Sequence, residues 1–256
     1  MSVLRGVPVA GARVVVTGAN RGIGLAFVQE ALAQGAATVY AGVRDPQDVT
    51  GELSATGATV VRLDVTSDAD VRAAAAECGD ATVVVNNAGL HAGDRLVEAT
   101  DPDAARAEME VNYFGPLRMI RAFAPVLTRA GHGSFVNVLS VAAIAPTAFM
   151  GGYSTSKAAA LYLGGIARGE LERHGISVTS LIVGSVDTRM AAHVAGHKED
   201  PREIARTGLA AMTRGEWTCD TDLMAVESRA RLARDPIRYE KGLAKLMFVS
   251  ELRTGK

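Results

Sequence analysis

The chain of 256 residues lacks the features that mark several classes of protein. It has two cysteines, Cys78 and Cys219, which stand far apart and without the paired spacing of a disulfide framework or a cysteine metal site. No apolar run approaches the roughly 18 residues of a membrane span. The N-terminal stretch has neither the long apolar core nor the cleavage site of a signal peptide. We therefore expect a cytoplasmic protein with no bound metal and no membrane contact.

An excess of charge of one sign is also missing. Lys and Arg together number 27 and Asp and Glu 28, which gives a formal net charge of −1. There is no basic run and no stripe of basic and aromatic residues, so binding to nucleic acid has little support. A chain with this charge is not attracted as a whole to anionic membranes either.

The composition that remains is that of an ordinary globular protein. Hydrophobic residues make up 48% and charged residues 21% of the chain. The length fits one large α/β domain or two small ones. Because no linker, internal repeat or low-complexity segment interrupts the pattern, the sequence predicts a single domain over residues 1–256.

Short runs of β-branched residues alternate with longer helical patterns. The runs are apolar on both faces, which is typical of strands in a parallel sheet covered by helices on both sides. Right-handed crossovers then give a doubly wound, Rossmann-like α/β fold with three layers, α/β/α. The predicted strands are 13–17, 38–43, 59–65, 82–89, 133–140 and 176–184, with a short last strand within 215–220.

Helical patterns fill the intervals between these strands. Ser67, with an aspartate three residues later, gives the segment 66–78 a capping pattern. A long helix over about 101–130 should be disturbed at its Gly-Pro pair, 115–116. The other predicted helices are 25–34, the helix that holds Tyr153, and two helices within 221–248.

Three glycines in "TGANRGIG" (17–24) stand between the first predicted strand and the first helix. At this place a doubly wound sheet binds a dinucleotide. Gly18, Gly22 and Gly24 allow a tight turn, close approach of the backbone to a pyrophosphate and close packing of the helix. The free N–H groups at the start of the helix favour phosphate. A glycine-rich turn that binds nothing is the competing interpretation, and the position between strand and helix disfavours it.

"YSTSK" (153–157) places Tyr153 and Lys157 four positions apart, on one face of a helix. A phenol with an ordinary pKa of about 10 exchanges its proton reluctantly at neutral pH. The ammonium of Lys157 should lower that pKa, because opposite charge stabilises a phenolate. The same spacing also arises by chance, so these five residues alone do not separate a proton-transfer centre from an ordinary surface pair.

Five motifs together resemble the short-chain dehydrogenase/reductase family, in its branch of about this chain length. They are "TGANRGIG", "NNAG" (86–89), Asn112, Ser140 and "YSTSK", in the family's order and spacing. The resemblance runs from about residue 10 to 190. It implies a nicotinamide-dependent oxidoreductase that acts on a carbonyl or secondary alcohol.

The resemblance also implies which residues bind the cofactor. "NNAG" has a second interpretation, a turn that stabilises the sheet, and we expect it to serve both purposes. The implied set consists of Gly18, Asn20, Arg21, Gly22, Ile23 and Gly24 in the glycine turn, Arg44, Asp64 and Val65 after the second and third strands, Asn86, Ala88 and Gly89 after the fourth, Tyr153 and Lys157, and Gly184, Val186 and Thr188 after the sixth.

The ribose 2′ position separates NAD from NADP, since an acid at the end of the second strand binds a hydroxyl and a cation binds a phosphate. NAD-preferring relatives carry their acid where this chain has Gly42 and Val43, and Arg44 follows. Arg21 is a second cation placed for the same phosphate, and the planar fork of arginine suits it. Asp45 could neutralise Arg44 in part. We predict NADPH or NADP as the cofactor.

The resemblance assigns roles to four catalytic residues. Tyr153 is the proton donor and acceptor, and Lys157, with the oxidised nicotinamide, lowers the pKa of the phenol and binds the ribose. Ser140 hydrogen-bonds the substrate oxygen as charge develops. Asn112 holds a water that links the lysine to solvent. The leading hypothesis is an NADPH-dependent carbonyl reductase; the alternatives are a catalytically silent cofactor-sensing or scaffold protein, and an epimerase or dehydratase.

The substrate is expected over the nicotinamide, and segment 185–214 is expected to cover it. The candidate lining residues are Val141, Phe149, Gly184 and Met190, and their apolar character predicts a hydrophobic or cyclic carbonyl compound or alcohol. His91, just after "NNAG", is a further candidate for the pocket, and a surface loop is the competing interpretation.

Three smaller features complete the picture. His193 and His197 have the i,i+4 spacing of a metal pair, but no third ligand is near, so we expect no metal. Val183 stands where relatives usually have proline, which should loosen the turn after the sixth strand, while Thr188 is retained. The family usually forms homodimers or homotetramers, and we expect the same here.

Overall fold

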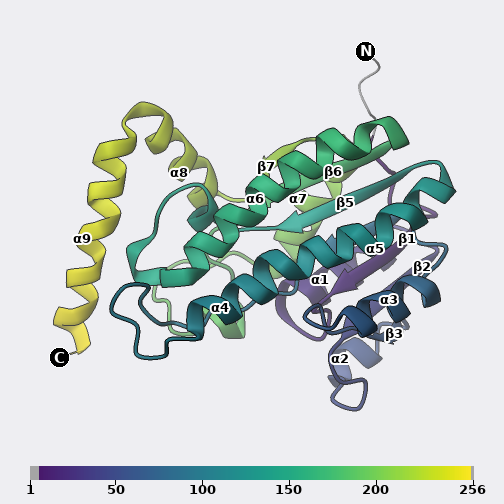
Figure 1. The fold of residues 1–256 in the computed structure, drawn as a ribbon, viewed down its shortest axis with the longest axis horizontal. Helices are drawn as coiled ribbons and strands as arrows, with labels where there is room; N and C mark the ends of the chain where they lie inside the picture. The colour runs from purple at the N-terminus through teal and green to yellow at the C-terminus, as the bar shows by residue number, and fades with distance from the viewer. Residues whose placement is uncertain (1–5, 255–256) are drawn as a thin grey trace.

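Seven short strands, several of them rich in valine, form one fully parallel sheet within residues 6–254, with the order β3-β2-β1-β4-β5-β6-β7. The computed structural model describes residues 6–254 (Figure 1). The chain order reverses between β1 and β4, which is the place where a doubly wound sheet binds its ligand. The strands are β1 Arg13–Thr17, β2 Thr38–Val43, β3 Thr59–Arg62, β4 Val83–Asn86, β5 Gly133–Val138, β6 Ile176–Ile182 and β7 Thr218–Asp220.

The predicted fold is confirmed, and the predicted strands differ mainly at their carboxyl ends. β1 and β2 begin and end where the sequence predicts. β4 stops at Asn86 and β5 at Val138, before the polar residues that the pattern had included. These last residues leave the hydrogen-bonded ladder because they form the loops of the candidate site.

Helices cover both faces of the sheet, as the two-sided apolar strands require. The α-helices are α1 Gly22–Ala33, α2 Gly51–Ser54, α3 Asp68–Glu77, α4 Ala104–Met109, α5 Gly115–Ala130, α6 Gly151–Leu171, α7 Pro201–Thr213, α8 Leu223–Arg234 and α9 Pro236–Thr254. Short 3₁₀ helices are η2 Val141–Ala143, η3 Ala148–Met150, η4 Glu172–His174 and η5 Arg189–Ala191. Ser67 caps α3 by accepting from the backbone N–H of Asp70, as its capping pattern predicts.

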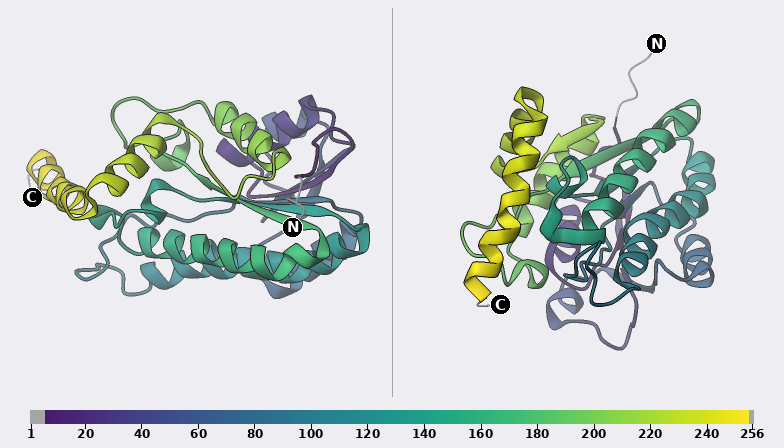
Figure 2. Two further views of the ribbon diagram at one scale, coloured as in Figure 1. Left: turned by 90° about the horizontal axis from the view of Figure 1, so that it is seen from above. Right: turned by 60° about the vertical axis from the view of Figure 1, so that its left-hand side comes forward.

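Two hydrophobic cores lie between the sheet and the helices on its two faces. Val14 and Val16 of β1 point into one core with α1 and α7, and Val15 points into the other with α3, α5 and α6. Successive side chains of a strand point to opposite faces of the sheet, so one strand contributes residues to both cores. Figure 2 shows α1 and α7 on one side of the sheet and α5 and α6 on the other.

The long helix predicted over 101–130 is broken by a π-helical turn, η1, at Glu110–Phe114. α4 precedes this turn and α5 follows it at Gly115. The expected disturbance thus lies just before the Gly-Pro pair. Such turns are rare and often mark functional sites, and Asn112 lies inside this one.

Part of the predicted substrate cover belongs to the core. In α7, Ile204, Leu209 and Met212 are fully buried, and the helix packs against α1. Residues 201–213 therefore form a core helix, in contrast to the expected cover over 185–214. Residues 185–200, which are largely polar, remain the candidate cover of the substrate.

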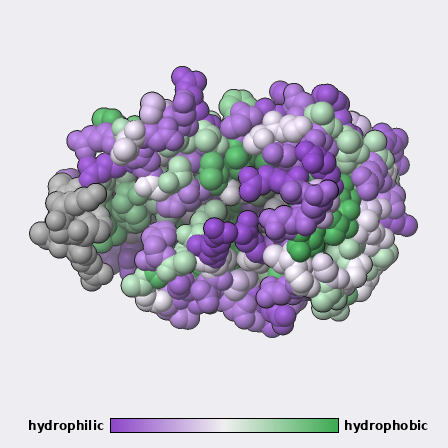
Figure 3. All heavy atoms as spheres, turned by 90° about the horizontal axis from the view of Figure 1, so that it is seen from below, coloured by the Kyte–Doolittle hydropathy of each residue, from purple (hydrophilic) through white to green (hydrophobic). Residues whose placement is uncertain are grey.

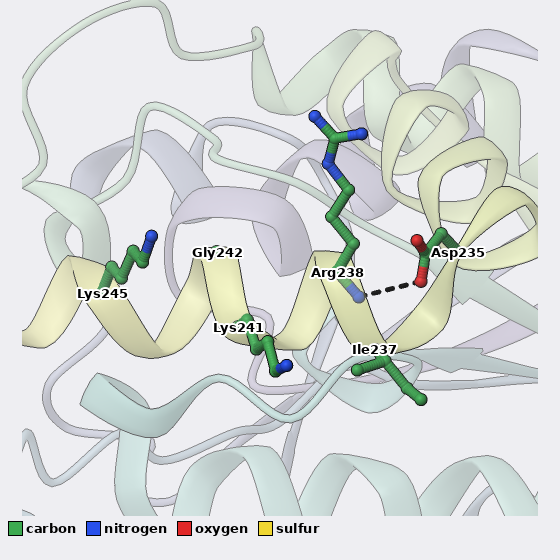
Figure 4. A pocket seen from close by; sticks show the side chains of 6 residues that line it. All are labelled: Asp235, Ile237, Arg238, Lys241, Gly242 and Lys245. Carbon is green, nitrogen blue, oxygen red and sulfur yellow. Dashed lines mark hydrogen bonds between the residues drawn. The ribbon is translucent and has the colours of Figure 1, made fainter.

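α9 stands at the edge of the fold, beside α8 and η3 and away from the sheet (Figure 1). A surface hollow of about 630 Å³ lies along it (Figure 4) and contains none of the predicted site residues. It is lined by Asp235, Ile237, Arg238, Lys241, Gly242 and Lys245. In Figure 4, Arg238 and Lys245 point to one side of the helix and Ile237 and Lys241 to the other.

The surface carries no sign of a broad apolar face in the view of Figure 3, where apolar residues form small patches among hydrophilic ones. Over residues 6–254, no helix combines the length and the apolar character needed to cross a membrane.

α4 and α6 cross closely at Gly152, the residue before Tyr153. A Cβ added to Gly152 would lie 2.8 Å from both Cα and Cβ of Ala105 and 2.6 Å from Oε2 of Glu108. Gly165, in the same helix, has nothing within 4 Å of such an atom. Replacement of each of these glycines by alanine therefore tests how closely α4 and α6 pack.

We predict that Gly152→Ala lowers the free energy of unfolding by about 1–3 kcal/mol, because the helices must move apart. Gly165→Ala, the matched control, should raise it by roughly 0.5–1 kcal/mol, since alanine is the better helix former. Urea unfolding followed by circular dichroism measures both. A Gly152→Ala protein as stable as the parent would contradict the close crossing.

Candidate active site

The glycine turn lies between β1 and α1, as the sequence predicts. Gly18 and Gly22 have φ angles of +63° and +56°, a region that favours glycine. A Cβ on Gly24 would lie 2.2 Å from the carbonyl oxygen of Gly18, so the third glycine is needed for the close contact of turn and helix. The first N–H groups of α1 start at this turn and suit an anion.

The glycine turn and the loop after β4 are joined by Thr17 and Asn87, neither of which the sequence analysis singled out. Oγ1 of Thr17 accepts from the backbone N–H groups of Asn87 and Ala88, both at 2.9 Å. Nδ2 of Asn87 donates to the carbonyl oxygens of Thr17 at 2.9 Å and Gly18 at 3.2 Å. A buried threonine ending a valine strand was the available signal. The two loops therefore form one rigid unit.

Asn20 ties the loop after β2 to the glycine turn. Its Nδ2 donates to the carbonyl oxygen of Asp48 at 2.7 Å, and its Oδ1 accepts from the N–H of Thr50 at 2.8 Å. The N–H of Ala19 donates to the carbonyl oxygen of Gly42 at 3.1 Å. The side chain of Asn20 is thus engaged with protein, and its contact with a cofactor stays a prediction.

Two arginines are predicted to bind the 2′-phosphate, Arg21 in the glycine turn and Arg44 after β2. Both are exposed, and neither has an ion-pair partner among the described side chains of residues 6–247. Asp45 does not pair with Arg44; its Oδ1 accepts from the N–H of Gln47 at 2.9 Å. At Gly42, an added Cβ would lie 2.7 Å from Cδ2 of Leu63 and 3.0 Å from the carbonyl oxygen of Val16, so a side chain there would require Leu63 to shift.

The predicted residues after β3 are held by local contacts. Oδ1 of Asp64 accepts from the N–H of Thr66 at 2.9 Å and from its hydroxyl at 2.7 Å. Val65 is buried, and a Cβ on Gly115 would lie 2.9 Å from its Cγ2. The π-helical turn therefore ends against the β3 loop.

Three parts of the chain bring the four catalytic candidates together in a buried cluster. Asn112 comes from the π-helical turn, Ser140 from the end of β5, and Tyr153 and Lys157 from the first two turns of α6; all four side chains are buried. The Lys157 ammonium lies 5.6 Å from the centroid of the Tyr153 ring and donates to the carbonyl oxygen of Val138 at 2.9 Å. The sequence prediction of a shared helix face is confirmed.

Asn112 fixes the loop after β4. Its Oδ1 accepts from the N–H of Leu90 at 2.8 Å, and its Nδ2 donates to the carbonyl oxygen of Leu90 at 2.8 Å and to Oγ of Ser156 at 2.9 Å. A Cβ on Gly89 would lie 3.4 Å from Oδ1 of Asn112 and 3.6 Å from the Lys157 ammonium. Glycine at 89 keeps this space open, and the water link stays a prediction.

Asn86, predicted to bind the cofactor, turns its side chain into the sheet. Its Nδ2 donates to Oδ1 of Asn137 at 2.9 Å, across the β4–β5 pairing. Its Oδ1 is buried without a partner among the described residues. This geometry supports the structural half of the joint role expected for "NNAG".

Burial shifts the pKa values of Tyr153 and Lys157 in opposite directions. It raises the pKa of Tyr153 to about 12, with a smaller contribution from Glu108, while a hydrogen bond from Ser140 acts in the opposite direction. Burial also lowers the pKa of Lys157 to about 8. In the polypeptide alone the phenol is therefore shifted upward, contrary to the lowering that the sequence analysis expected from Lys157.

Glu108 is a buried acid that the sequence analysis missed. It lies in α4, and its Oε1 accepts from the N–H of Ala92 at 2.8 Å. Burial raises the pKa of its carboxyl group. Nothing in its local sequence separates it from an exposed helical glutamate, because burial comes from the crossing with α6.

The turn after β6 is anchored, in contrast to the loosening expected from Val183. The N–H of Gly184 donates to Oδ2 of Asp222 at 2.7 Å, and Oδ1 of Asp222 accepts from the N–H of Ala225 at 3.0 Å. The buried carboxylate thus joins this turn to the start of α8. Val186 is buried, and Cγ2 of Thr188 lies 3.1 Å from where a Cβ of Gly22 would be, so the segment lies against the glycine turn.

The predicted pocket residues differ in their surroundings. His91 lies beside Tyr153, with ring centroids 5.1 Å apart. Val141 is half-buried near the end of β5. Phe149 and Met190 are 42% and 45% exposed, and the 3₁₀ helix of Phe149 packs beside α9. Only His91 is in contact with Tyr153 through an aromatic pairing, while the lining roles of the others stay predictions.

Metal binding finds no support within residues 6–254, where no three potential His, Cys, Asp or Glu ligands are grouped. His197 pairs instead with Oε1 of Glu199 at 3.1 Å. Both cysteines are buried and free.

Comparisons with known proteins agree with the geometry. The family model described as short chain dehydrogenase matches residues 12–199. The short-chain dehydrogenase ptmH of Penicillium ochrochloron is 37% identical over 183 residues, which are 68% of this chain and 66% of that protein. The NADPH-dependent 1-acyldihydroxyacetone phosphate reductase of Schizosaccharomyces pombe is 33% identical over 193 residues, 72% of this chain and 62% of that protein. The chain thus spans slightly less than two thirds of the length of these relatives.

A solved structure matches over almost the whole chain. A short chain dehydrogenase from Burkholderia cenocepacia, in complex with NADP, has a TM-score of 0.86 and 40% sequence identity. The match covers 93% of this chain and 99% of that one. The likeness therefore extends beyond residue 199 into the carboxyl-terminal part of the chain.

We predict that the buried Lys157 makes stability depend on pH. Its pKa is about 8 in the folded protein and 10.5 ordinarily, so the unfolded chain holds the proton more tightly and the free energy of unfolding rises between these pH values. Between pH 7.5 and 10, the free energy of unfolding of the parent should rise by about 2–3 kcal/mol relative to that of Lys157→Met.

Urea unfolding at several pH values measures this difference, and taking it against the variant cancels the titration of other groups. Lys245→Met, at an exposed lysine of α9, is the control and should follow the parent. Parallel pH profiles for the parent and Lys157→Met would show that the ammonium is not buried.

Proposed function

The chain belongs to the short-chain dehydrogenase family, and we propose that it is an NADPH-dependent carbonyl reductase. In this proposal hydride moves between the nicotinamide and a carbonyl or secondary alcohol carbon, and Tyr153 gives or takes the proton. The observation that carries the proposal is the buried cluster of Tyr153, Lys157 and Ser140 at the carboxyl edge of the sheet. Burial of the Lys157 ammonium and the Tyr153 hydroxyl costs desolvation energy, which disfavours a purely structural role for the pair.

The residues present fit a dinucleotide. The glycine turn offers free helix N–H groups, and Gly89 leaves space beside the Lys157 ammonium. Arg21 in the glycine turn and Arg44 after β2 are exposed cations. When bound, the nicotinamide supplies or accepts the hydride.

Each catalytic residue then has a definite task. The raised pKa keeps Tyr153 protonated in the polypeptide, so that its hydroxyl can donate to a carbonyl oxygen in the direction of reduction. Lys157, with a pKa of about 8, is mostly an ammonium at neutral pH and stabilises the phenolate that remains. Ser140 donates to the same oxygen region and holds the developing charge. Asn112 keeps the β4 loop in place beside them.

The preference for NADPH over NADH has three supports. Arg21 and Arg44 are free cations. The acid that binds a ribose hydroxyl is missing at the end of β2, where Gly42 and Val43 stand. One relative is named as NADPH-dependent, and the solved dehydrogenase holds NADP.

We further propose a hydrophobic or cyclic substrate and a homo-oligomeric assembly. For the substrate, the support is the set of apolar residues around the end of β5, Val141 among them. For the assembly, the support is the outer face of α6, where Tyr162 and Ile166 are 76% and 60% exposed. A catalytically silent protein on the same fold is the alternative, and the retained Tyr153 and Lys157 disfavour it.

We predict that Tyr153→Phe lowers turnover by about 10²- to 10⁴-fold, because it removes the proton donor and little else. NADPH oxidation is followed by absorbance with a panel of cyclic and aromatic ketones, and NADPH binding by fluorescence titration should change little. Tyr40→Phe is the matched control, since the Tyr40 hydroxyl donates to Asp80 and belongs neither to the site nor to the proposed assembly face. Undiminished turnover in Tyr153→Phe would exclude the proposed mechanism.

We also predict that Arg44→Asp shifts the cofactor preference. It replaces a cation for the 2′-phosphate with an anion that repels it, so kcat/KM for NADPH relative to NADH should fall by about 10- to 100-fold. The control is Arg129→Asp, at an exposed residue in the last turn of α5. An unchanged NADPH to NADH ratio would remove Arg44 from cofactor recognition.

A further inference from the structure

His91 lies against the catalytic tyrosine but has no part in the mechanism above. The two rings meet edge to face, with centroids 5.1 Å apart and an interplanar angle of 62°. Leu90, the preceding residue, is fixed through both its N–H and its carbonyl oxygen by Asn112. The position of His91 relative to the phenol is therefore set by the same residue that organises the catalytic loop.

The Nε2 atom of His91 is buried and has no hydrogen-bond partner among residues 6–254. Buried polar atoms are almost always paired in proteins. Leaving one unpaired costs about 1–3 kcal/mol, which a ligand group recovers when it forms the missing bond. The unpaired atom thus points to a ligand at the place where the substrate meets Tyr153.

The imidazole also lies next to the candidate cover. The ring of His193, from the segment between η5 and α7, has its centroid 6.3 Å from that of His91. His91 therefore stands between the catalytic phenol and the segment expected over the substrate. A molecule whose carbonyl oxygen binds the Tyr153 phenol would therefore lie near this ring.

The charge state of His91 limits what it recognises. Burial, and to a lesser degree His193, lowers its pKa, so the ring is neutral at neutral pH. The other titratable groups around it are the Tyr153 phenol and Glu108, which binds the N–H of the next residue, Ala92. A neutral imidazole has one donor and one acceptor nitrogen. It suits a hydroxyl or carbonyl group better than a charged one.

We propose that His91 is a specificity residue that hydrogen-bonds, through Nε2, a second oxygen on the carbon next to the reacting carbonyl. The substrate class is then α-hydroxy ketones and α-dicarbonyl compounds with hydrophobic or cyclic frameworks. One oxygen is held by Tyr153 and Ser140 and the adjacent oxygen by His91. This inference rests on the proposed reductase function.

The test compares matched pairs of substrates, such as cyclohexanone and acetophenone with their α-hydroxy derivatives, with NADPH as the reductant. His91→Phe keeps an aromatic ring against Tyr153, although a slightly larger one, and removes both hydrogen-bonding nitrogens. It should lower kcat/KM for the α-hydroxy member of each pair by about 10- to 100-fold and for the plain ketone by less than about threefold. His91→Gln, which restores an amide donor and acceptor, should recover part of the loss. His132→Phe, at an exposed histidine before β5, should leave the ratio unchanged.

The outcomes distinguish a failure of the proposed role of His91 from a failure of the proposed reductase function. Equal losses for both members of the pairs, or an unchanged ratio in His91→Phe, would overturn the role of His91 while leaving the reductase intact. Reduction of neither kind of ketone by the parent would contradict the proposed function, and the inference with it. Circular dichroism and NADPH binding confirm that each variant is folded.

Discussion

The burial of Tyr153 and Lys157 at the carboxyl edge of the sheet is the constraint on which the site depends. A phenol and an ammonium removed from water both lose solvation, so the pKa of one rises and that of the other falls. The fold must offset this loss with fixed partners, and it does so with the carbonyl oxygen of Val138 and the hydroxyl of Ser140. Both partners come from the end of β5, where the chain leaves the sheet.

The same edge is held together by side chains that join the strand ends. Thr17 and Asn87 connect the loops after β1 and β4, and Asn20 connects the glycine turn to the loop after β2. Asp222 anchors the turn after β6 to the start of α8. Each bond fixes one loop against its neighbour, so that the cofactor surface is built before any cofactor binds. Preorganisation of this kind lowers the cost of ligand binding.

Much of the fold and the centre of the site could be predicted from the sequence, because local patterns determine them. Two-sided apolar runs gave the parallel sheet, and the spacing of Tyr153 and Lys157 placed them on one helix face. The residues that were missed act through tertiary contacts. Glu108 is buried only by the crossing of α4 and α6, and Asp222 meets Gly184 across 38 positions. The upward shift of the Tyr153 pKa was also missed, since its main cause is burial by the tertiary fold.

The most direct test of this account is the ionisation of Tyr153, followed by NMR of labelled tyrosine ring carbons and assigned with Tyr153→Phe. Without cofactor, the Tyr153 signal should keep its protonated shift until the pH approaches about 12. With NADP⁺ added, the positive nicotinamide should move the transition to lower pH. A Tyr153 that ionises near the ordinary value of 10.0 in the protein alone, or that does not respond to NADP⁺, would contradict the account.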